Sequence, residues 1–167
     1  MQIEELSRQA SLDLLARVGF GRLACAKQSQ PYITPIHYAY HEGYIYGFTT
    51  VGQKVEWMRT NPLVCLEADE IKGPQQWSSV IVFGRYEELP NSEEVREIAR
   101  NLLTQREIWW EPGFAKTIVH GTARPLVPVY YRILIEQITG HLASATEVSK
   151  QDVLDKVNWL KALLARL

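Results

Sequence analysis

At Gly47-Phe48-Thr49-Thr50-Val51-Gly52-Gln53-Lys54, a strand-like run of residues ends and a helix begins. The run ends in two hydroxyl side chains, a glycine turn follows, and Lys54 lies in the first turn of the helix. Hydroxyls, free backbone N–H groups, a helix N-terminus and a cation together suit one small anion, such as a phosphate. The alternative is that Thr50 only caps the helix and that Lys54 points into water.

Strand patterns lie on both sides of this turn. Short polar turns join the first three of them, which predicts an antiparallel meander, because parallel strands would need long crossovers. Six strands are expected in all, over residues 20–26, 32–40, 44–49, 63–68, 77–89 and 129–138. Residues 69–76 contain Gly73-Pro74 and are expected to form an exposed loop. Six antiparallel strands are best closed into a barrel, since closure removes exposed edges, and residues 78–84 would cross its core.

Helices are expected to flank and interrupt this barrel. Apolar spacing predicts a helix over residues 7–18, and a second helix over 52–59 ends before Asn61-Pro62. A third helix opens at Asn91-Ser92-Glu93-Glu94, with the acidic residues in its first turn, and runs to about residue 106. A C-terminal helix over 148–167 carries one apolar stripe that packs on its own sheet or on a partner subunit. The expected fold is therefore mainly β, in a single domain over residues 1–167: an N-terminal helix (1–19), a barrel (20–142) and the C-terminal helix.

Composition excludes several classes of protein. The 167 residues carry a formal net charge of −1 with a pI near 6.4, which gives no electrostatic footprint for a nucleic acid. No apolar run approaches the ~20 residues that span a bilayer, and no signal-peptide pattern opens the sequence. Cys25 and Cys65 fit two buried thiols in a reducing compartment, so we expect a cytoplasmic location. The four histidines show no metal-site spacing, and no metal is expected.

A second group of residues extends the candidate site. Pro35 cannot donate to a strand ladder, so the strand through Thr34-Pro35-Ile36-His37 is expected to be an edge or bulged there. Its free backbone groups would suit the rim of a flat heterocycle. Ser78 and Ser79, which begin another strand, add hydroxyl donors. The pattern predicts a phosphate clamp beside a slot for a planar ring.

The sequence also resembles a known family. The blocks that carry the resemblance are Gly21-Arg22-Leu23-Ala24, Pro35-Ile36-His37-Tyr38-Ala39-Tyr40, Phe48-Thr49-Thr50-Val51-Gly52-Gln53-Lys54, Cys65-Leu66-Glu67-Ala68-Asp69-Glu70, Trp77-Ser78-Ser79-Val80-Ile81-Val82-Phe83-Gly84-Arg85 and Arg132-Ile133-Leu134-Ile135-Glu136-Gln137-Ile138-Thr139-Gly140-His141. In this order, over about residues 8–142, they are similar to the FMN-binding split β-barrels of the pyridoxamine 5′-phosphate oxidase-like superfamily, and specifically to its nitroimidazole-resistance-like branch. The resemblance implies a six-stranded split barrel that forms a homodimer, with FMN in clefts at the subunit interface.

The resemblance also implies roles for individual residues. Thr49 and Thr50 would contact the FMN phosphate or ribityl chain, Lys54 would pair with the phosphate, and Gln53 occupies a neighbouring position of the clamp. The flavin edge would lie along a second group of residues: Thr34, Pro35, Ile36 and His37. The flavin would also be reached, from the neighbouring subunit, by Ser78 and Ser79.

Two departures from the oxidases themselves argue against vitamin B6 oxidation. Those enzymes place an arginine on the strand where this chain has Ile33-Thr34-Pro35, and they end in an Arg- and Trp-containing signature that Ile138-Thr139-Gly140-His141 does not reproduce. With fewer cations on the phosphate, FMN would be held less tightly, because charge-assisted contacts are the stronger ones.

The expected function is that of an FMN-dependent oxidoreductase acting on a small molecule, with the redox chemistry supplied by the flavin. No Gly-x-Gly-x-x-Gly motif is present, so NAD(P)H would bind only transiently at the flavin. His37 is the candidate proton donor, or else an ordinary hydrogen-bonded strand residue. Three alternatives stay open: a flavin store or sensor without turnover, a haem-binding split barrel, and a deazaflavin such as F420 in place of FMN.

Overall fold

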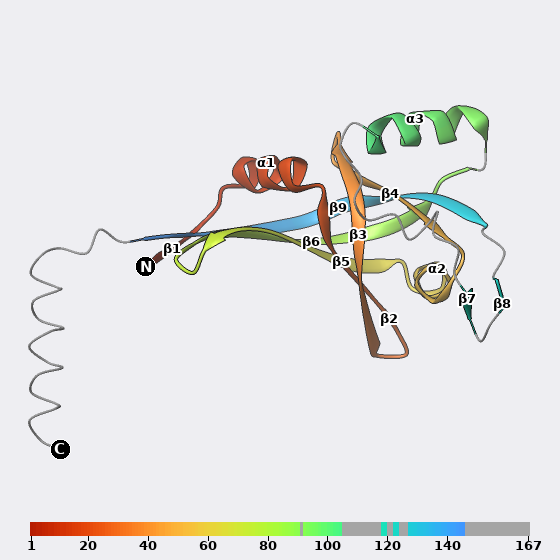
Figure 1. Ribbon diagram of the computed structural model, residues 1–167, viewed down its shortest axis with the longest axis horizontal. Helices are drawn as coiled ribbons and strands as arrows, with labels where there is room; N and C mark the ends of the chain where they lie inside the picture. The colour runs from red at the N-terminus through yellow and green to blue at the C-terminus, as the bar shows by residue number, and fades with distance from the viewer. Residues whose placement is uncertain (91, 105–117, 120–121, 124–126, 146–167) are drawn as a thin grey trace, which may run out of the picture.

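The computed structural model describes residues 1–90, 92–104, 118–119, 122–123 and 127–145. Long strands dominate this part of the chain, with helices between them (Figure 1). In chain order the elements are β1 (Gln2–Glu5), α1 (Arg8–Val18), β2 (Phe20–Lys27), β3 (Gln30–His41), β4 (Tyr44–Thr50), α2 (Gln53–Thr60), β5 (Leu63–Gly73), β6 (Gln76–Glu88), α3 (Glu93–Leu103), β7 (Ile118–Val119), β8 (Thr122–Ala123) and β9 (Pro128–Ser144).

Within the described residues, six antiparallel strands close into a ring. The order is β9-β4-β3-β2-β5-β6, and β6 pairs again with β9. This confirms the expected barrel of six antiparallel strands. A seventh strand, β1, was not expected from the sequence: it pairs with the far end of β9, outside the ring, and its side chains are exposed.

The barrel is split between β3 and β4. These two strands pair only where residues 38–41 of β3 meet residues 44–47 of β4. Before Tyr38, β3 pairs with β2 alone, and after Gly47, β4 pairs with β9 alone. Figure 1 shows the consequence, since β2 and β3 leave the ring together as a two-stranded arm. Helix α2 packs against this arm, with Trp57 edge-on to Tyr32 at a ring-centroid distance of 5.8 Å.

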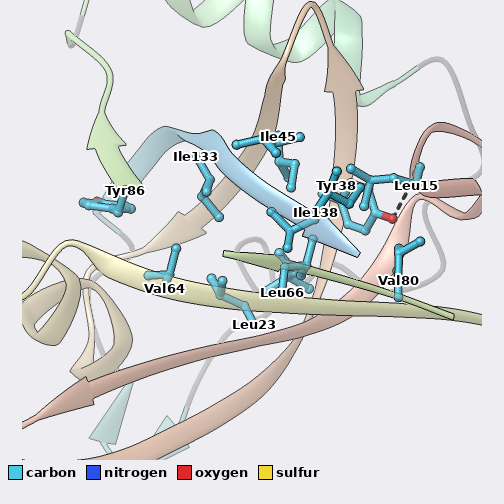
Figure 2. Packing of buried hydrophobic residues seen from close by; sticks show 14 of the residues in the cluster. Leu15, Leu23, Tyr38, Ile45, Val64, Leu66, Val80, Tyr86, Ile133 and Ile138 are labelled. Atoms are coloured by element: carbon cyan, nitrogen blue, oxygen red, sulfur yellow. Dashed lines mark hydrogen bonds between the residues drawn. The ribbon is translucent and has the colours of Figure 1, made fainter. Parts of the chain in front are cut away.

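Alternate residues of each strand fill the barrel, as Figure 2 shows. Val80 and Val82 of β6 are fully buried, as expected for the run that crosses the core. Helix α1 begins after Ser7, which caps it, and ends at Gly19, which has a left-handed conformation. Its Leu15 side chain packs into the core of the barrel. The Tyr38 hydroxyl fixes this helix by donating to the Leu15 carbonyl at 2.9 Å.

Two strand boundaries differ from the expectation. The prediction of an exposed loop over residues 69–76 is wrong. Strand β5 continues to Gly73 and β6 begins at Gln76, and the two strands pair up to the turn between them. Strand β9 likewise runs beyond residue 138, to Ser144, because it pairs with both β6 and β1 there. The expected C-terminal helix lies outside the described residues. Within the described residues, no helix combines the length and apolar character needed to cross a bilayer.

Candidate functional site in the barrel split

Two threonine hydroxyls face the opening between β3 and β4. The side chains of Thr49 on β4 and Thr34 on β3 alternate in step with the inward-facing residues of their strands, and Thr49 is buried. In the described part of the chain, each hydroxyl makes only a 3.5 Å contact, to the carbonyl of Thr50 and of Pro35 respectively. Good O–H···O bonds are 2.5–3.0 Å long. Both hydroxyls are therefore free to bind a ligand that enters the split.

Lys54 is a half-buried cation in the first turn of α2, the helix that follows β4. Burial lowers the pKa of its ammonium to about 8, an effect that the neighbouring Cys25 thiol partly offsets. No carboxylate of the described residues forms an ion pair with it, although buried charges are normally paired. The sequence alternative that Lys54 points into water is therefore wrong. A cation with little water and no acidic partner among the described residues suits a bound anion such as a phosphate.

The start of α2 leaves room for that anion. The helix is capped by Gly52 in an extended conformation, without a side-chain hydrogen bond, so the alternative that Thr50 caps the helix is also wrong. Instead, Thr50 is the last residue of β4 and pairs with Pro128. Gln53 is exposed in the first turn. The N–H groups of this turn are available to an anion because no capping side chain occupies them.

The residues expected along the flavin edge divide between the two faces of β3. The strand is an edge next to the split but is not bulged, since Pro35 pairs in register with Arg22. Ile36 is fully buried in the core, whereas the side chains of Pro35 and His37 lie on the outward face of the strand. Of the four residues, Thr34 alone lies on the inward face of the strand and is also partly exposed.

His37 is held by a helix. Its Nε2 lies 3.3 Å from the carbonyl oxygen of Leu103, which accepts the bond, so the ring nitrogen must donate. This contact ties β3 to the C-terminal end of α3, and it favours the interpretation of His37 as a hydrogen-bonded strand residue. Its role as a proton donor stays a prediction.

Ser78 and Ser79 lie far from the split within one chain. They pair with Leu142 and His141 near the end of β9, whereas Thr49 pairs with Val129 near its beginning. Ser78 is buried and points inward, and Ser79 lies on the outer surface of the barrel. Both serines stay predictions that require a second subunit.

Sequence reasoning missed Cys25 as a neighbour of Lys54. Strand alternation places this thiol inside the barrel, but its approach to α2 is a tertiary contact that the spacing of the residues does not reveal. Both cysteines are free; Cys25 is buried and Cys65 is partly exposed. Among the described residues, no three His, Cys, Asp or Glu side chains group as metal ligands.

Comparisons with known proteins agree with this fold. A family model described as pyridoxamine 5′-phosphate oxidase matches residues 7–142. The uncharacterized protein RA0666 of Rhizobium meliloti strain 1021 is 36% identical over 151 residues, which cover 89% of this chain and 100% of the relative.

Solved structures are similar as well. An FAD-binding protein (mll6688) from Mesorhizobium loti is 41% identical, with a TM-score of 0.72, and the match covers 86% of this chain and 100% of the other. A candidate 5-nitroimidazole antibiotic resistance protein from Bacteroides thetaiotaomicron is 15% identical, with a TM-score of 0.61 and coverages of 85% and 89%, so it shares the fold alone. Because the family model spans most of the sequence, the chain belongs to the pyridoxamine 5′-phosphate oxidase family.

Proposed function

We propose that the chain binds FMN in the split and is an FMN-dependent oxidoreductase. One observation carries the proposal: Lys54, in the first turn of α2, is a partly desolvated cation without a carboxylate partner in the described part of the chain, and the Thr49 hydroxyl near the end of the preceding strand makes only a 3.5 Å contact there. The Mesorhizobium loti protein described as FAD-binding supports a flavin, since it is 41% identical over its whole length. FMN is the simpler fit, because it places one terminal phosphate on one lysine.

The residues of this chain would bind and orient the cofactor. Lys54 and the first turn of α2 hold the phosphate, and the Thr49 and Thr34 hydroxyls contact the ribityl chain and the ring edge. The bound flavin supplies hydride or electron transfer to a small molecule. NAD(P)H would approach the exposed ring face transiently, and His37 is the candidate proton donor.

A second copy of the chain is expected to complete the site. Neighbouring strands β3, β2, β5 and β6 place a row of outward residues side by side: Ile33, Ala24, Cys65 and Phe83. Ile33 is 65% exposed and Phe83 is 49% exposed, which is unusual for large apolar side chains on one face. Ser79 lies on the same outer surface of β6. Covering this face with a homodimer partner would bury the row and bring Ser79 towards the partner's cofactor.

The visible spectrum of the purified protein tests the cofactor. Flavin absorbance, with FMN released on boiling, is the expected result. Released FAD or a deazaflavin would replace FMN in the proposal, and a haem Soret band would favour the haem-binding alternative. Anaerobic bleaching by NADH or NADPH is expected of an oxidoreductase. A yellow protein that neither nucleotide bleaches would instead be a flavin store or sensor.

A further inference from the structure

We propose that Asn61 is a positioning residue for the phosphate clamp. It attaches helix α2, which carries Lys54, to strand β2. This inference rests on the proposed function, since it assigns a role in holding the flavin phosphate. Asn61 was not among the candidate site residues, and it is not expected to touch the ligand.

Asn61 uses its side chain and its backbone to anchor the end of α2. Its side-chain Nδ2 donates to the carbonyl of Ala26 on β2 at 3.0 Å. Its Oδ1 accepts from the backbone N–H of Leu63 at 3.3 Å, at the start of β5. Its own backbone N–H donates to the Trp57 carbonyl at 2.8 Å, which ends the helix. One residue therefore joins α2, β2 and β5.

The anchor lies on the same side of α2 as the clamp. Residues 54, 58 and 61 recur at the spacing of one helical face. Met58, between the two polar residues, is fully buried. Ala26, which accepts the Asn61 bond, follows Cys25, the thiol beside Lys54. The bond from Asn61 to β2 thus fixes the position of α2 and, with it, the position of Lys54 two helical turns away.

A second link between α2 and the barrel runs in another direction. Arg59 makes a bidentate ion pair with Glu88 of β6, with both N···O distances at 2.7 Å. The two side chains are 45% and 36% exposed, so water weakens the pair. The link from Asn61 to Ala26 is half-buried, so it is the firmer constraint on the helix relative to β2.

The physical role follows from the burial of Lys54. A desolvated ammonium without an anion is unfavourable, so the lysine side chain gains free energy by turning into water. A rigidly docked helix opposes that movement and keeps the cation in place before the phosphate arrives. Such preorganisation strengthens binding because less ordering is required when the ligand binds.

Asn61→Asp tests this role. The substitution keeps the Oδ1 acceptor for Leu63 and removes the donor to Ala26. Thr60→Ala is the matched control, because the Thr60 hydroxyl only bonds back to the Glu56 carbonyl of the same helix at 3.0 Å. Dissociation constants for FMN and for riboflavin, which lacks the phosphate, are measured by fluorescence quenching at pH 7, together with the melting temperature.

In Asn61→Asp, we expect FMN affinity to fall about tenfold, on the scale of one lost hydrogen bond, while riboflavin affinity is unchanged. The alkaline loss of FMN affinity should also shift to higher pH, because a released Lys54 regains water. Thr60→Ala should change neither. If Asn61→Asp fails to fold, Asn61→Ser, which also lacks the Nδ2 donor, is measured in the same way.

Equal weakening of FMN and riboflavin, or an unchanged FMN affinity in a folded variant, would overturn the role of Asn61 alone. Wild-type protein that binds riboflavin and FMN equally well would overturn the phosphate clamp, and wild-type protein that binds no flavin would overturn the proposed function. Either result removes the basis for this inference too.

Discussion

Tyr131 of β9 fills the space that a side chain at Gly47 of β4 would need. The two residues pair across the sheet, and the ring and hydroxyl of Tyr131 overlap the position of a Cβ built on Gly47. Glycine normally weakens a strand, but here it permits the close approach of a large aromatic ring. The site therefore depends on this contact, because Gly47 is the last β4 residue before the split.

Gly47→Ala should destabilise the protein by about 2–4 kcal/mol, because the new methyl group forces a buried ring from its place. Gly73→Ala is the matched control, since nothing lies within 4 Å of a Cβ at Gly73, and its effect should be small. Urea denaturation followed by circular dichroism measures both. Equal stability of the two variants would show that Tyr131 can move aside.

Tyr131→Phe should leave the stability unchanged or raise it by about 1 kcal/mol. The Tyr131 hydroxyl is buried and finds no hydrogen-bond partner among the described protein atoms, and its burial raises the pKa of the phenol. Tyr38→Phe is the control, because it removes the bond to the Leu15 carbonyl and should destabilise by about 1 kcal/mol. A larger loss in Tyr131→Phe than in Tyr38→Phe, measured by thermal unfolding, would contradict this.

Lys54→Met should affect stability and binding in opposite directions. Removing the desolvated charge should stabilise the ligand-free protein, by about 1 kcal/mol, whereas FMN binding should weaken by about 1.5–3 kcal/mol. Lys72→Met is the control, because Lys72 is 67% exposed and pairs with Glu70. Fluorescence titration gives the affinity, and unchanged FMN binding would exclude Lys54 as the phosphate ligand.

The pH dependence of binding and of stability should also run in opposite directions. Folding lowers the pKa of Lys54 from its ordinary 10.5 to about 8, so between these values the unfolded chain binds more protons than the folded chain. The Lys54 contribution to the stability of the ligand-free protein therefore rises with pH across this window. FMN affinity should fall as the pH rises above about 8, because the phosphate prefers the charged ammonium.

Riboflavin is the control for this pH profile, since it carries the same ring without the phosphate. Its affinity should stay level over the same range. A parallel alkaline fall for FMN and riboflavin would assign the titration to another group.

Phe83→Asp should disrupt the proposed homodimer and weaken FMN binding with it. The substitution places a charge at the β6 end of the apolar row, where a partner would have to desolvate it. Ile98→Asp is the control, because Ile98 is 55% exposed on α3, away from that row. Light scattering at micromolar concentration measures the mass. A wild-type monomer that binds FMN would show that one chain forms a complete site.

Sequence periodicity was sufficient to predict the six strands of the ring and the turn before α2. Alternation in residues 20–26 and 44–49 marks their inward faces, and Asn61-Pro62 marks the end of α2. The strand at the N-terminus could not be predicted, because β1 is exposed along its length and forms only by pairing with β9. The ends of β5 and β6 were missed for a different reason: the Gly73-Pro74 signal marks a tight hairpin turn rather than a long loop, and the two strands pair right up to it.

The sequence by itself determined which residues carry the candidate chemistry, because two threonines and a lysine around a glycine turn are a local pattern. Only the tertiary structure decided what that pattern does. The separation of β3 from β4 opens the split, the packing of α2 desolvates Lys54 beside Cys25, and Asn61 holds the helix there. Burial and long-range pairing set these properties, and both depend on residues far apart in the chain.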